Sequence, residues 1–354
     1  MEQFRTDVLI IGAGPAGSSA ALWACRNGVD ALMVEQRKKV GVPVQCAEFI
    51  PAMLLKDLDQ ERAFIVQKIK GMRTYINGKM EKEIQTPGLM IKRDLFDQAL
   101  AESAKKSGAI LFTGTKAVAL SDQRSVLLKR EGKHDLEVHA KVIVAADGPL
   151  SQVRTWVNAP RQNPLPAVQM SFSLPSASDF TEVFFDRTIH AGYAWLFPKG
   201  DIANVGVGFR KNNRFPQSPG KLLGQFVSQL KDQGKILGES LSHRAGWIPA
   251  EPIRKAVYGN ILFVGDAAGQ THPITGAGIF SAVTCGTMAG EVAARAIRKN
   301  DFSQLMDYDH EWQEMFERTQ THAHLCRRKM ETQWDNFDQI IKSCWVAFGA
   351  YHAG

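Results

Sequence analysis

Residues 6–35 read TDVLIIGAGPAGSSAALWACRNGVDALMVE, and the rest of the chain is organised around this stretch. It predicts an apolar strand over Val8–Ile11, a tight glycine turn, a helix of small residues over Ala16–Asn27 and a second strand that ends at Glu35. A strand, a helix and a second strand in this order are typical of the first unit of a doubly wound α/β sheet. The chain is therefore expected to open with a βαβ unit.

Three glycines in the turn indicate what this unit binds. Gly12, Gly14 and Gly17 fit G-x-G-x-x-G, which allows a sharp exit from the strand, close backbone approach to a pyrophosphate and tight packing of the helix on the sheet. The helix N-terminus offers free N–H groups to phosphates. Glu35, 18 residues after Gly17, can accept both ribose hydroxyls of an adenosine. We predict a dinucleotide site; the alternative is a glycine-rich turn that only packs.

Length and charge limit the class of protein. The chain has 354 residues, more than the roughly 250 to 300 at which a single core stops growing, so two interleaved lobes and a C-terminal appendage are expected. The net charge of +7 suits an anionic cofactor, an anionic membrane face or an acidic partner. Lys and Arg concentrate only at 37–39 and 327–329, which argues against nucleic acid as a partner.

The sequence gives no sign of export. No apolar run approaches the roughly 18 residues of a membrane span, and residues 1–5 leave no room for a signal peptide before the first strand. The five cysteines are odd in number and scattered, which predicts reduced thiols rather than a disulfide framework. We therefore expect a cytoplasmic protein.

The remaining elements are predicted from periodicity and turn residues. Residues 36–50 are expected to loop over the cofactor, Asn77-Gly78 predicts a hairpin within 68–90, and an amphipathic helix is expected over Arg93–Ser107. Residues 160–260 alternate like antiparallel strands, with one helix, and the last 50 residues are expected to be helical. The other expected elements are strands over 109–113, 117–120, 125–130, 135–139 and 141–147 and helices over 221–231 and 279–299.

A second motif follows the predicted strand over 141–147. Asp147-Gly148, with Ser151 and Arg154 after it, falls at the carboxyl end of that strand. In an open α/β sheet this edge borders the ligand crevice. Alone, the motif could equally be a turn or a helix cap.

A third motif follows the strand within 260–269. The carboxylate of Asp266, next to Gly265, can accept a hydroxyl of a flavin side chain. Pro273, Gly276 and Gly278 then lead into the helix over 279–299, whose N-terminus favours the negative charge of a reduced flavin. The order and spacing of the three motifs carry more information than any one of them.

Together these motifs resemble those of the FAD-dependent geranylgeranyl reductases, within the wider flavoprotein group typified by para-hydroxybenzoate hydroxylase. The resemblance covers residues 5–300, where GAGPAG, ADGPLSQVR and GDAAGQTHPITGAGI look like the three FAD motifs of the group. PVQCAEFI (43–50) is similar to the family's Cys-Gly/Ala-Glu loop beside the flavin, and AGYAWLFPKGDIANVGVGF (191–209) to its Y-x-W-x-F-P motif. Phe49 departs from the glycine of many relatives, which could narrow the substrate cavity.

The resemblance implies site residues and a fold. It implies catalytic roles for Cys46 near the flavin and for Tyr193 and Trp195 facing the substrate. It also implies an α/β fold with a Rossmann-like FAD-binding domain of the GR2 type, an antiparallel β-sheet substrate domain and C-terminal helices. The FAD-binding residues, from the motifs and the resemblance together, are Gly12, Gly14, Ala16, Gly17, Glu35, Gln36, Cys46, Ala47, Arg93, Val118, Asp147, Asp266, Gly276, Gly278 and Ile279.

We expect three parts in the chain. The FAD-binding domain is discontinuous, over 1–67, 91–160 and 255–300. The substrate domain comprises 68–90 and 161–254, and 301–354 forms a C-terminal helical segment whose sequence after 325 matches no pattern of the family.

The chemistry expected is hydride transfer through FAD. No second G-x-G-x-x-G follows a strand, so NAD(P)H is expected to bind transiently over the flavin, or a protein supplies the electrons. Cys46 has three interpretations: a proton-donating or redox thiol, a packing residue, or half of a dithiol, the last disfavoured because no C-x-x-C exists.

The predicted function is reduction of a hydrophobic or carrier-bound substrate at a double bond or at a disulfide such as lipoyl. The alternatives are a flavin-dependent monooxygenase and a flavoprotein that donates electrons during maturation of a protein-bound cofactor. Peripheral membrane contact and a partner protein are compatible with both the charge and the family.

Other candidate residues are weaker. On a helix, we expect the first and last side chains of the run His322, His324, Cys326 to point about 200° apart, so we predict no metal site. His190 and His272 lie near flavin-facing motifs and either could donate a proton, although structural histidines are more common. The aromatic tail could line a substrate tunnel or contact a membrane, with packing on the core as the favoured interpretation.

Overall fold

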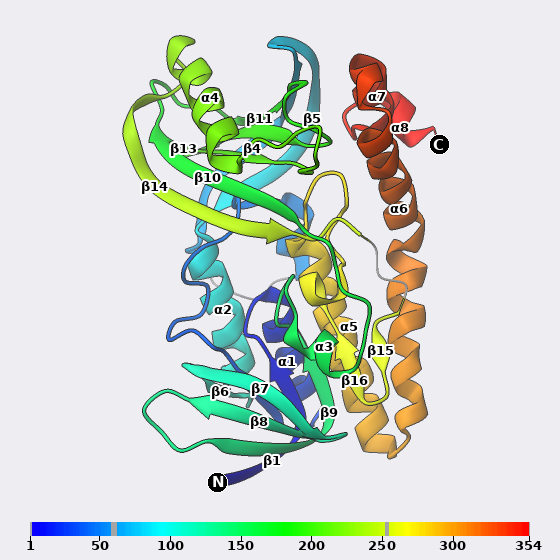
Figure 1. Ribbon diagram of the computed structural model, residues 1–354. Coiled ribbons are helices and arrows are strands. Elements are labelled where there is room, and N and C mark those ends of the chain that lie inside the picture. Colours follow the sequence, from blue (N-terminus) through cyan, green and yellow to red (C-terminus); the bar gives the residue numbers. More distant parts are fainter. Residues whose placement is uncertain (1, 58–61, 252–254, 354) are drawn as a thin grey trace.

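The computed structural model describes residues 2–57, 62–251 and 255–353. Two eight-stranded sheets each form the centre of a lobe, and the C-terminal helices run along one side of the molecule (Figure 1). The N-terminus lies at the far end of the first lobe and the C-terminus lies beside the second (Figure 1). The predicted mixed α/β class with C-terminal helices is confirmed. The division into three domains stays a prediction.

The first sheet has the order β15-β16-β9-β1-β2-β6, and the strands from β16 to β6 are parallel. A hairpin, β7 with β8, joins it antiparallel to β9. The two strands expected over 135–139 and 141–147 are one continuous strand, β9. The strands are β1 (Glu2–Ile11), β2 (Ala31–Val34), β6 (Ile110–Phe112), β7 (Thr115–Asp122), β8 (Ser125–Arg130), β9 (Leu136–Ala145), β15 (Val257–Tyr258) and β16 (Ile261–Phe263).

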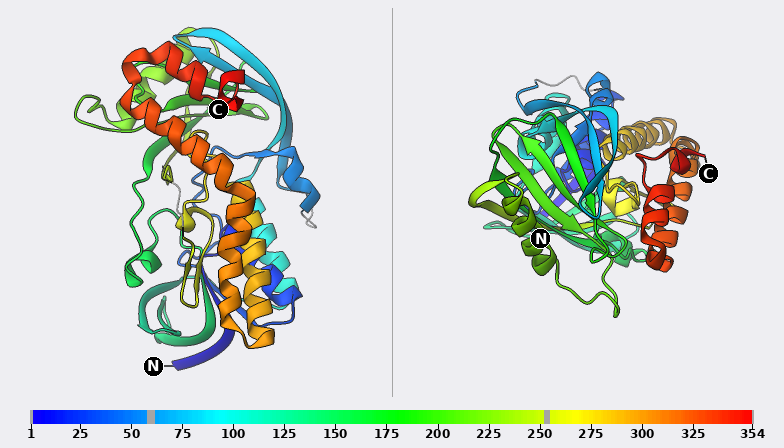
Figure 2. Two further views of the ribbon diagram at one scale, coloured as in Figure 1. Left: turned by 90° about the vertical axis from the view of Figure 1, so that its right-hand side faces the viewer. Right: turned by 90° about the horizontal axis from the view of Figure 1, so that it is seen from above.

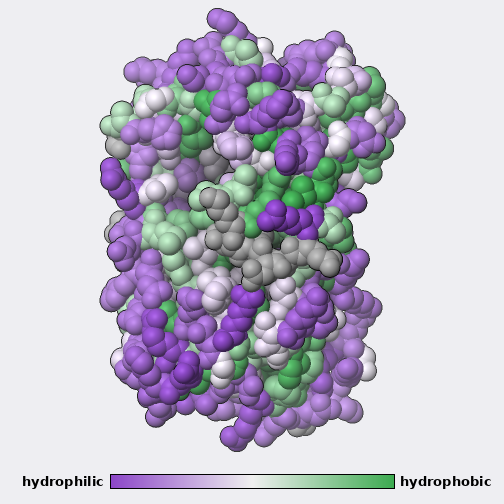
Figure 3. Space-filling view, turned by 180° about the vertical axis from the view of Figure 1, so that it is seen from behind, coloured by the Kyte–Doolittle hydropathy of each residue, from purple (hydrophilic) through white to green (hydrophobic). Residues whose placement is uncertain are grey.

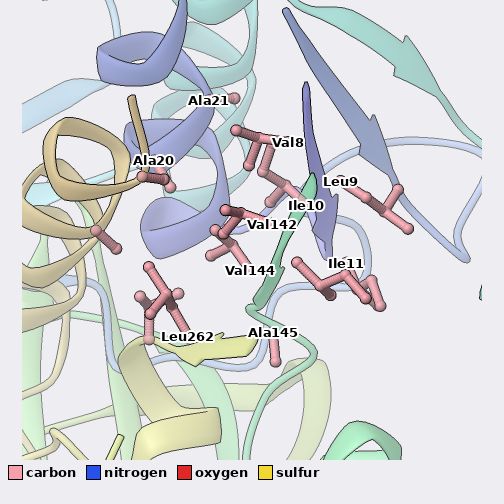
Figure 4. Packing of buried hydrophobic residues seen from close by; sticks show 14 of the residues in the cluster. Val8, Leu9, Ile10, Ile11, Ala20, Ala21, Val142, Val144, Ala145 and Leu262 are labelled. Atoms are coloured by element: carbon pink, nitrogen blue, oxygen red, sulfur yellow. The ribbon is translucent and has the colours of Figure 1, made fainter. Parts of the chain in front are cut away.

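The core of this lobe lies between β1, β9 and two helices, α1 (Pro15–Arg26) and α5 (Ile279–Lys299) (Figure 4). Strand β1 is buried on both faces over Val8–Ile11, as expected for a parallel strand covered by helices. Helix α5 packs on α1 through two glycines, Gly286 and Gly290. A Cβ on Gly286 would lie 2.2 Å from the Ala16 carbonyl oxygen, so this contact brings the two helix backbones together.

The second sheet has the order β14-β10-β13-β12-β11-β4-β5-β3 and is antiparallel except at the β11/β4 pair. The predicted hairpin is confirmed: β4 and β5 are joined by Asn77 and Gly78, which have φ of 50° and 79°. The strands are β3 (Phe49–Pro51), β4 (Ile65–Ile76), β5 (Lys79–Ile91), β10 (Leu165–Ser173), β11 (Phe180–Phe185), β12 (Tyr193–Lys199), β13 (Ile202–Gly208) and β14 (Leu237–Ile248).

A long helix, α6 (Met306–Thr332), extends from the first lobe along the side of the second (Figure 2). Among the described residues, no helix is both long enough and apolar enough to cross a membrane. The remaining helices are α2 (Arg93–Lys106), α3 (Gln152–Trp156), α4 (Pro219–Asp232), α6 (Met306–Thr332), α7 (Phe337–Cys344) and α8 (Gly349–His352), with 3₁₀ turns at Ala52–Asp57, Gly265–Ala268, Phe302–Leu305 and Trp334–Asn336.

Candidate active site

A cavity of ≈ 480 Å³ lies where the two lobes meet. The starts of α1, α2 and α5 and the loops after β9 and β16 line one side, and the second sheet lines the other. The cavity brings together eleven of the residues predicted from the sequence: Gly14, Ala16, Cys46, Ala47, Arg93, Tyr193, Trp195, Asp266, Gly276, Gly278 and Ile279. The predicted residues that do not line it are Gly12, Gly17, Glu35, Gln36, Val118 and Asp147. Contact with FAD or substrate stays a prediction for all of these residues, those that line the cavity included.

The glycine loop has the close contacts that its pattern requires. Gly12 has a φ of 105°, and a Cβ there would lie 2.3 Å from the Ala146 carbonyl oxygen. A Cβ on Gly17 would lie 1.9 Å from the Gly12 carbonyl oxygen. Gly14 differs, because a Cβ there meets nothing within 4 Å and the residue borders the cavity. Gly12 and Gly17 therefore shape the loop, while Gly14 leaves its backbone open to a ligand.

Glu35 is already bonded to the backbone around this loop. Its Oε2 accepts from the Ala13 N–H at 3.1 Å and its Oε1 from the Arg37 N–H at 2.9 Å. A carboxylate has about four acceptor sites, so these bonds leave room for ribose hydroxyls. Glu35 thus also holds the loop in place, a role that the sequence did not indicate.

Asp147 caps the short helix α3. Its Oδ2 accepts from the N–H groups of Gln152 and Val153 at 2.7 and 3.2 Å. Its Oδ1 is buried and has no partner among the described residues. Burial raises the pKa of Asp147, and the side chain of Ser151 with the capping N–H groups opposes that rise. The capping oxygen, Oδ2, matches the interpretation of this motif as a helix cap. The free oxygen, Oδ1, matches its interpretation as part of a ligand site.

The loop after β16 presents a carboxylate and a helix start to the cavity. Asp266 Oδ1 accepts from the Thr271 hydroxyl at 2.6 Å, and burial raises the pKa of Asp266 although Thr271 and Arg93 oppose it. Gly278 precedes α5 and provides no side-chain cap, so the first N–H groups of α5 are open to an acceptor. A Cβ on Gly278 would lie 2.7 Å from the Thr271 hydroxyl, which explains the glycine.

Cys46 lies on the loop before β3, half-buried, with its sulfur accepting from the Glu48 N–H at 3.1 Å. Beside it, Arg93 donates from Nε to Asp97 Oδ1 at 2.7 Å. Burial lowers the pKa of the Arg93 guanidinium, but Asp97 and the Cys46 sulfur raise it more, so the net direction is upward. Arg93 is therefore a fixed positive charge next to the Cys46 thiol.

Tyr193 and Trp195 stand on β12 in the cavity wall, and both are held by hydrogen bonds. The Tyr193 hydroxyl donates to the Thr275 carbonyl at 2.5 Å, and burial raises the pKa of Tyr193 to about 12. The Trp195 Nε1 donates to Gln169 Oε1 at 3.0 Å. Tyr193 therefore stays protonated near neutral pH and ties the second sheet to the loop before α5.

The C-terminal tail contributes to the cavity, which agrees with one of the roles suggested by its aromatic residues. Trp345 lines it, is 2% exposed, and packs against Tyr193 with ring centroids 5.3 Å apart. Its Nε1 donates to the Thr74 hydroxyl at 2.9 Å. Phe49 also lies in the wall, with its ring centroid 6.2 Å from that of Phe197. The tail thus both packs on the second sheet and lines the cavity.

Neither candidate histidine lines the cavity. His190 is 2% exposed and bonds the carbonyls of Arg210 and Glu331. His272 accepts at Nδ1 from the Thr275 N–H at 3.2 Å and bonds the Tyr351 hydroxyl at 3.1 Å through Nε2. Burial lowers the pKa of His272 to about 4, so it is neutral near neutral pH. The geometry favours the structural interpretation of both.

The predicted divergence of His322 and Cys326 is wrong. Residues four apart on a helix lie on the same face, and the Cys326 sulfur is 3.6 Å from His322 Nε2. His324 is two residues from each, a step that turns a helix by about 200°. Within the described ranges, no three His, Cys, Asp or Glu side chains group in a way that could hold a metal ion.

The residues around the cavity fit FAD. Gly14 and Gly278 leave two helix N-termini uncapped at the cavity, and such termini bind phosphates and other anionic groups. Two carboxylates, Asp147 and Asp266, retain oxygens that could accept hydroxyl groups. The fit rests on this chain's donors and acceptors and on the close backbone contacts at its glycines.

Comparison with known proteins agrees with this fit. The chain matches the FAD binding domain family over residues 5–323 and is a flavoprotein of that family. It is 34% identical to digeranylgeranylglycerophospholipid reductase from Methanocaldococcus jannaschii over 326 residues, 87% of this chain and 82% of that protein. It belongs to the geranylgeranyl reductase family of FAD-dependent oxidoreductases, as its motifs predicted.

Solved structures show the same fold. A geranylgeranyl bacteriochlorophyll reductase-like protein from Thermoplasma acidophilum superposes with a TM-score of 0.89 at 28% identity, over 98% of this chain and 93% of that one. A probable FAD-dependent monooxygenase from Pseudomonas aeruginosa superposes with a TM-score of 0.70 at 19% identity, over 95% of this chain and 99% of that one. The second likeness concerns the fold alone.

Proposed function

We propose that this enzyme reduces carbon–carbon double bonds in the prenyl chain of a hydrophobic substrate, with NAD(P)H as electron donor. The observation that carries the proposal is the shared cavity: flavin-loop residues line one side, and apolar side chains line the other, among them Met72, Ile84, Val183, Phe197 and Val346. Such a wall suits an alkenyl chain. The name of the Methanocaldococcus relative supports the same class of substrate.

Hydride transfer is the chemistry that bound FAD supplies. The chain's residues would place the double bond and exclude water, with Tyr193 and Trp195 held rigidly in the wall. A proton must also reach the second carbon of the double bond. Cys46 is the cavity-lining thiol beside the fixed charge of Arg93, so we assign the proton donation to Cys46.

The test is anaerobic mixing of the FAD-loaded protein with NADPH or NADH, followed by addition of digeranylgeranylglycerophospholipid in detergent. We expect the visible flavin absorbance to bleach without the lipid and to return when the lipid is added, with slow return in air. Bleaching that requires a substrate, with peroxide formed at once in air, would favour the monooxygenase. No bleaching by either nucleotide would point to a protein electron donor. Return of the flavin absorbance on addition of a lipoyl protein would indicate that the substrate is a carrier-bound disulfide.

Replacement of Cys46 with alanine tests the proposed acid. We expect the variant to keep FAD and its reduction by nicotinamide, and to reduce the lipid about 100-fold more slowly. Cys25→Ala is the control, because Cys25 is also partly exposed but lies on α1 outside the cavity wall. Lipid reduction at the wild-type rate by Cys46→Ala would leave Cys46 as a packing residue.

The substrate class also leads us to propose peripheral contact with an anionic membrane. The chain carries a net charge of +7, and hydrophobic residues gather near the middle of the face opposite to that of Figure 1 (Figure 3). We expect sedimentation with anionic vesicles that weakens between about 50 and 200 mM salt, since surface electrostatics are screened. Equal sedimentation with neutral vesicles would contradict an electrostatic contact.

A further inference from the structure

Glu48 has an unusual conformation for a residue with a side chain. Its φ is 71°, in the left-handed region, and it is only 1% exposed. It stands between the Cys46 loop and β3. Residues in this region persist only where their surroundings hold them, and they often occur at functional sites. We therefore expect contacts with other residues to hold Glu48 in this conformation.

The partners come from three strands of the second sheet. Glu48 Oε2 accepts from Lys199 Nζ at 2.7 Å, Asn204 Nδ2 at 3.0 Å and Arg244 Nη1 at 3.0 Å. These residues lie on β12, β13 and β14. The other oxygen, Oε1, accepts from the Arg93 N–H at 3.0 Å. One buried carboxylate thus joins the loop to the substrate wall and to the start of α2.

The loop backbone is held from the same side. Asn204 Nδ2 also donates to the Ala47 carbonyl at 3.1 Å, and Gln169 Nε2 donates to the Cys46 carbonyl at 3.3 Å. Gln169 is the residue that accepts from Trp195. The position of the thiol, the carboxylate and the indole in the cavity wall is therefore set by one connected network.

The charges in this network do not cancel. Lys199 and Arg244 face a single carboxylate, while Arg93 is paired with Asp97. The side chain of Lys199 is 11% exposed, and Arg244 lines the cavity. Removal of the negative charge would leave two cations without their partner in a largely buried place, where each repels the other. The loop would then lose the contact that fixes its left-handed turn.

We propose that Glu48 is a positioning residue of the reaction: through Lys199, Asn204 and Arg244, its carboxylate fixes the loop so that the Cys46 thiol faces the cavity beside Arg93. The inference rests on the proposed function for its catalytic consequence. It goes beyond that function by naming the residues that place the proton donor. Misplacement of a reacting group by about 1 Å can cost 100-fold in rate.

The test compares Glu48→Gln, Glu48→Asp, Cys46→Ala and the double variant Glu48→Gln/Cys46→Ala in FAD-loaded protein. We expect Glu48→Gln to lower kcat for digeranylgeranylglycerophospholipid by about 10- to 100-fold, with KM and flavin reduction by nicotinamide within about threefold of wild type. Glu48→Asp should recover part of the rate. The double variant should be no slower than the slower single variant, because both changes remove the same function, proton donation by the Cys46 thiol.

The matched control is Glu182→Gln. Glu182 is also a buried carboxylate, 7% exposed, bonded to Lys235 and Tyr75, but it lies outside the cavity wall. Losses that multiply in the double variant, or equal losses in Glu182→Gln, would overturn the proposal. If Glu48→Gln does not fold, Lys199→Met keeps Arg244 on the carboxylate and should give a smaller loss of the same kind.

Hydrogen exchange of the loop amides gives a readout that needs no substrate. We expect the amides of residues 46–48 to exchange about tenfold faster in Glu48→Gln than in wild type, and to be unchanged in Glu182→Gln. Unchanged exchange in Glu48→Gln would overturn the positioning role whatever the substrate is. Failure of the wild-type enzyme to reduce any prenyl lipid, with the exchange difference present, would instead reject the proposed function.

Discussion

Gly12→Ala is expected to yield protein that retains no FAD through purification. The residue has a φ of 105°, and the added Cβ would lie 2.3 Å from the Ala146 carbonyl oxygen. The Ala146 carbonyl belongs to the backbone, so the loop must move to admit the methyl group. A displacement that costs about 3 kcal/mol corresponds to a loss of about two orders of magnitude in affinity. The measurement is the ratio of flavin to protein absorbance, followed by titration with FAD.

Two other glycines separate the causes of this loss. Gly28→Ala introduces a Cβ at a φ of 78° with nothing within 4 Å, outside the cavity wall, so it tests backbone strain alone. Gly14→Ala introduces no strain and no contact within the protein. Its methyl group would instead project where we predict that the ligand contacts the backbone of the loop. We expect Gly28→Ala to keep FAD and Gly14→Ala to fold normally with weaker binding. FAD retention by Gly12→Ala equal to wild type would refute the predicted role of the loop.

Much of the fold was predictable because its signals are local. The βαβ unit over 6–35, the Asn77-Gly78 hairpin and the helix over 279–299 each depend on residues within a few positions of one another. Glycines carry much of this signal, since glycine adopts a positive φ at little cost and permits close backbone approach. The cavity residues on these loops were therefore found from the sequence.

The Glu48 network was missed for the opposite reason. Its carboxylate meets Lys199, Asn204 and Arg244 at separations of 151, 156 and 196 residues. No local pattern distinguishes these polar residues from others on the same strands. A left-handed glutamate also leaves no mark in the sequence, because glycine is the residue expected there. Such contacts can be recognised only when the second sheet has been placed against the loop.

The error at His322 and Cys326 has a different origin. The helix was predicted correctly, but a four-residue step turns a helix by about 400°, which leaves the side chains only about 40° apart. The contact between them is what that step requires. Here the structure corrects an inference about geometry rather than one about secondary structure.

Trp345→Ala is expected to shift the substrate preference of the enzyme toward longer prenyl chains. The indole forms part of the apolar wall, packed against Tyr193 and against Phe185 at 5.1 Å between ring centroids. Its removal would enlarge the cavity and lower stability by about 3–5 kcal/mol. Each buried methylene contributes about 0.8 kcal/mol, so room for part of an isoprene unit can change kcat/KM about tenfold. The measurement is the ratio of kcat/KM for geranylgeranyl and farnesyl diphosphate.

Trp334→Ala separates this effect from loss of stability. Trp334 belongs to the same tail, is 4% exposed and donates from Nε1 to the Arg187 carbonyl at 2.9 Å, but it does not line the cavity. Both variants should melt at lower temperatures, whereas only Trp345→Ala should change the ratio for the two chains. Trp345→Phe keeps an aromatic ring but loses the bond to Thr74, so its ratio should fall between those of wild type and alanine. If Trp345→Ala leaves the ratio of kcat/KM for the two chains unchanged, the tail stabilises the cavity wall without selecting chain length. The end of the cavity that limits the prenyl chain would then be formed by other residues.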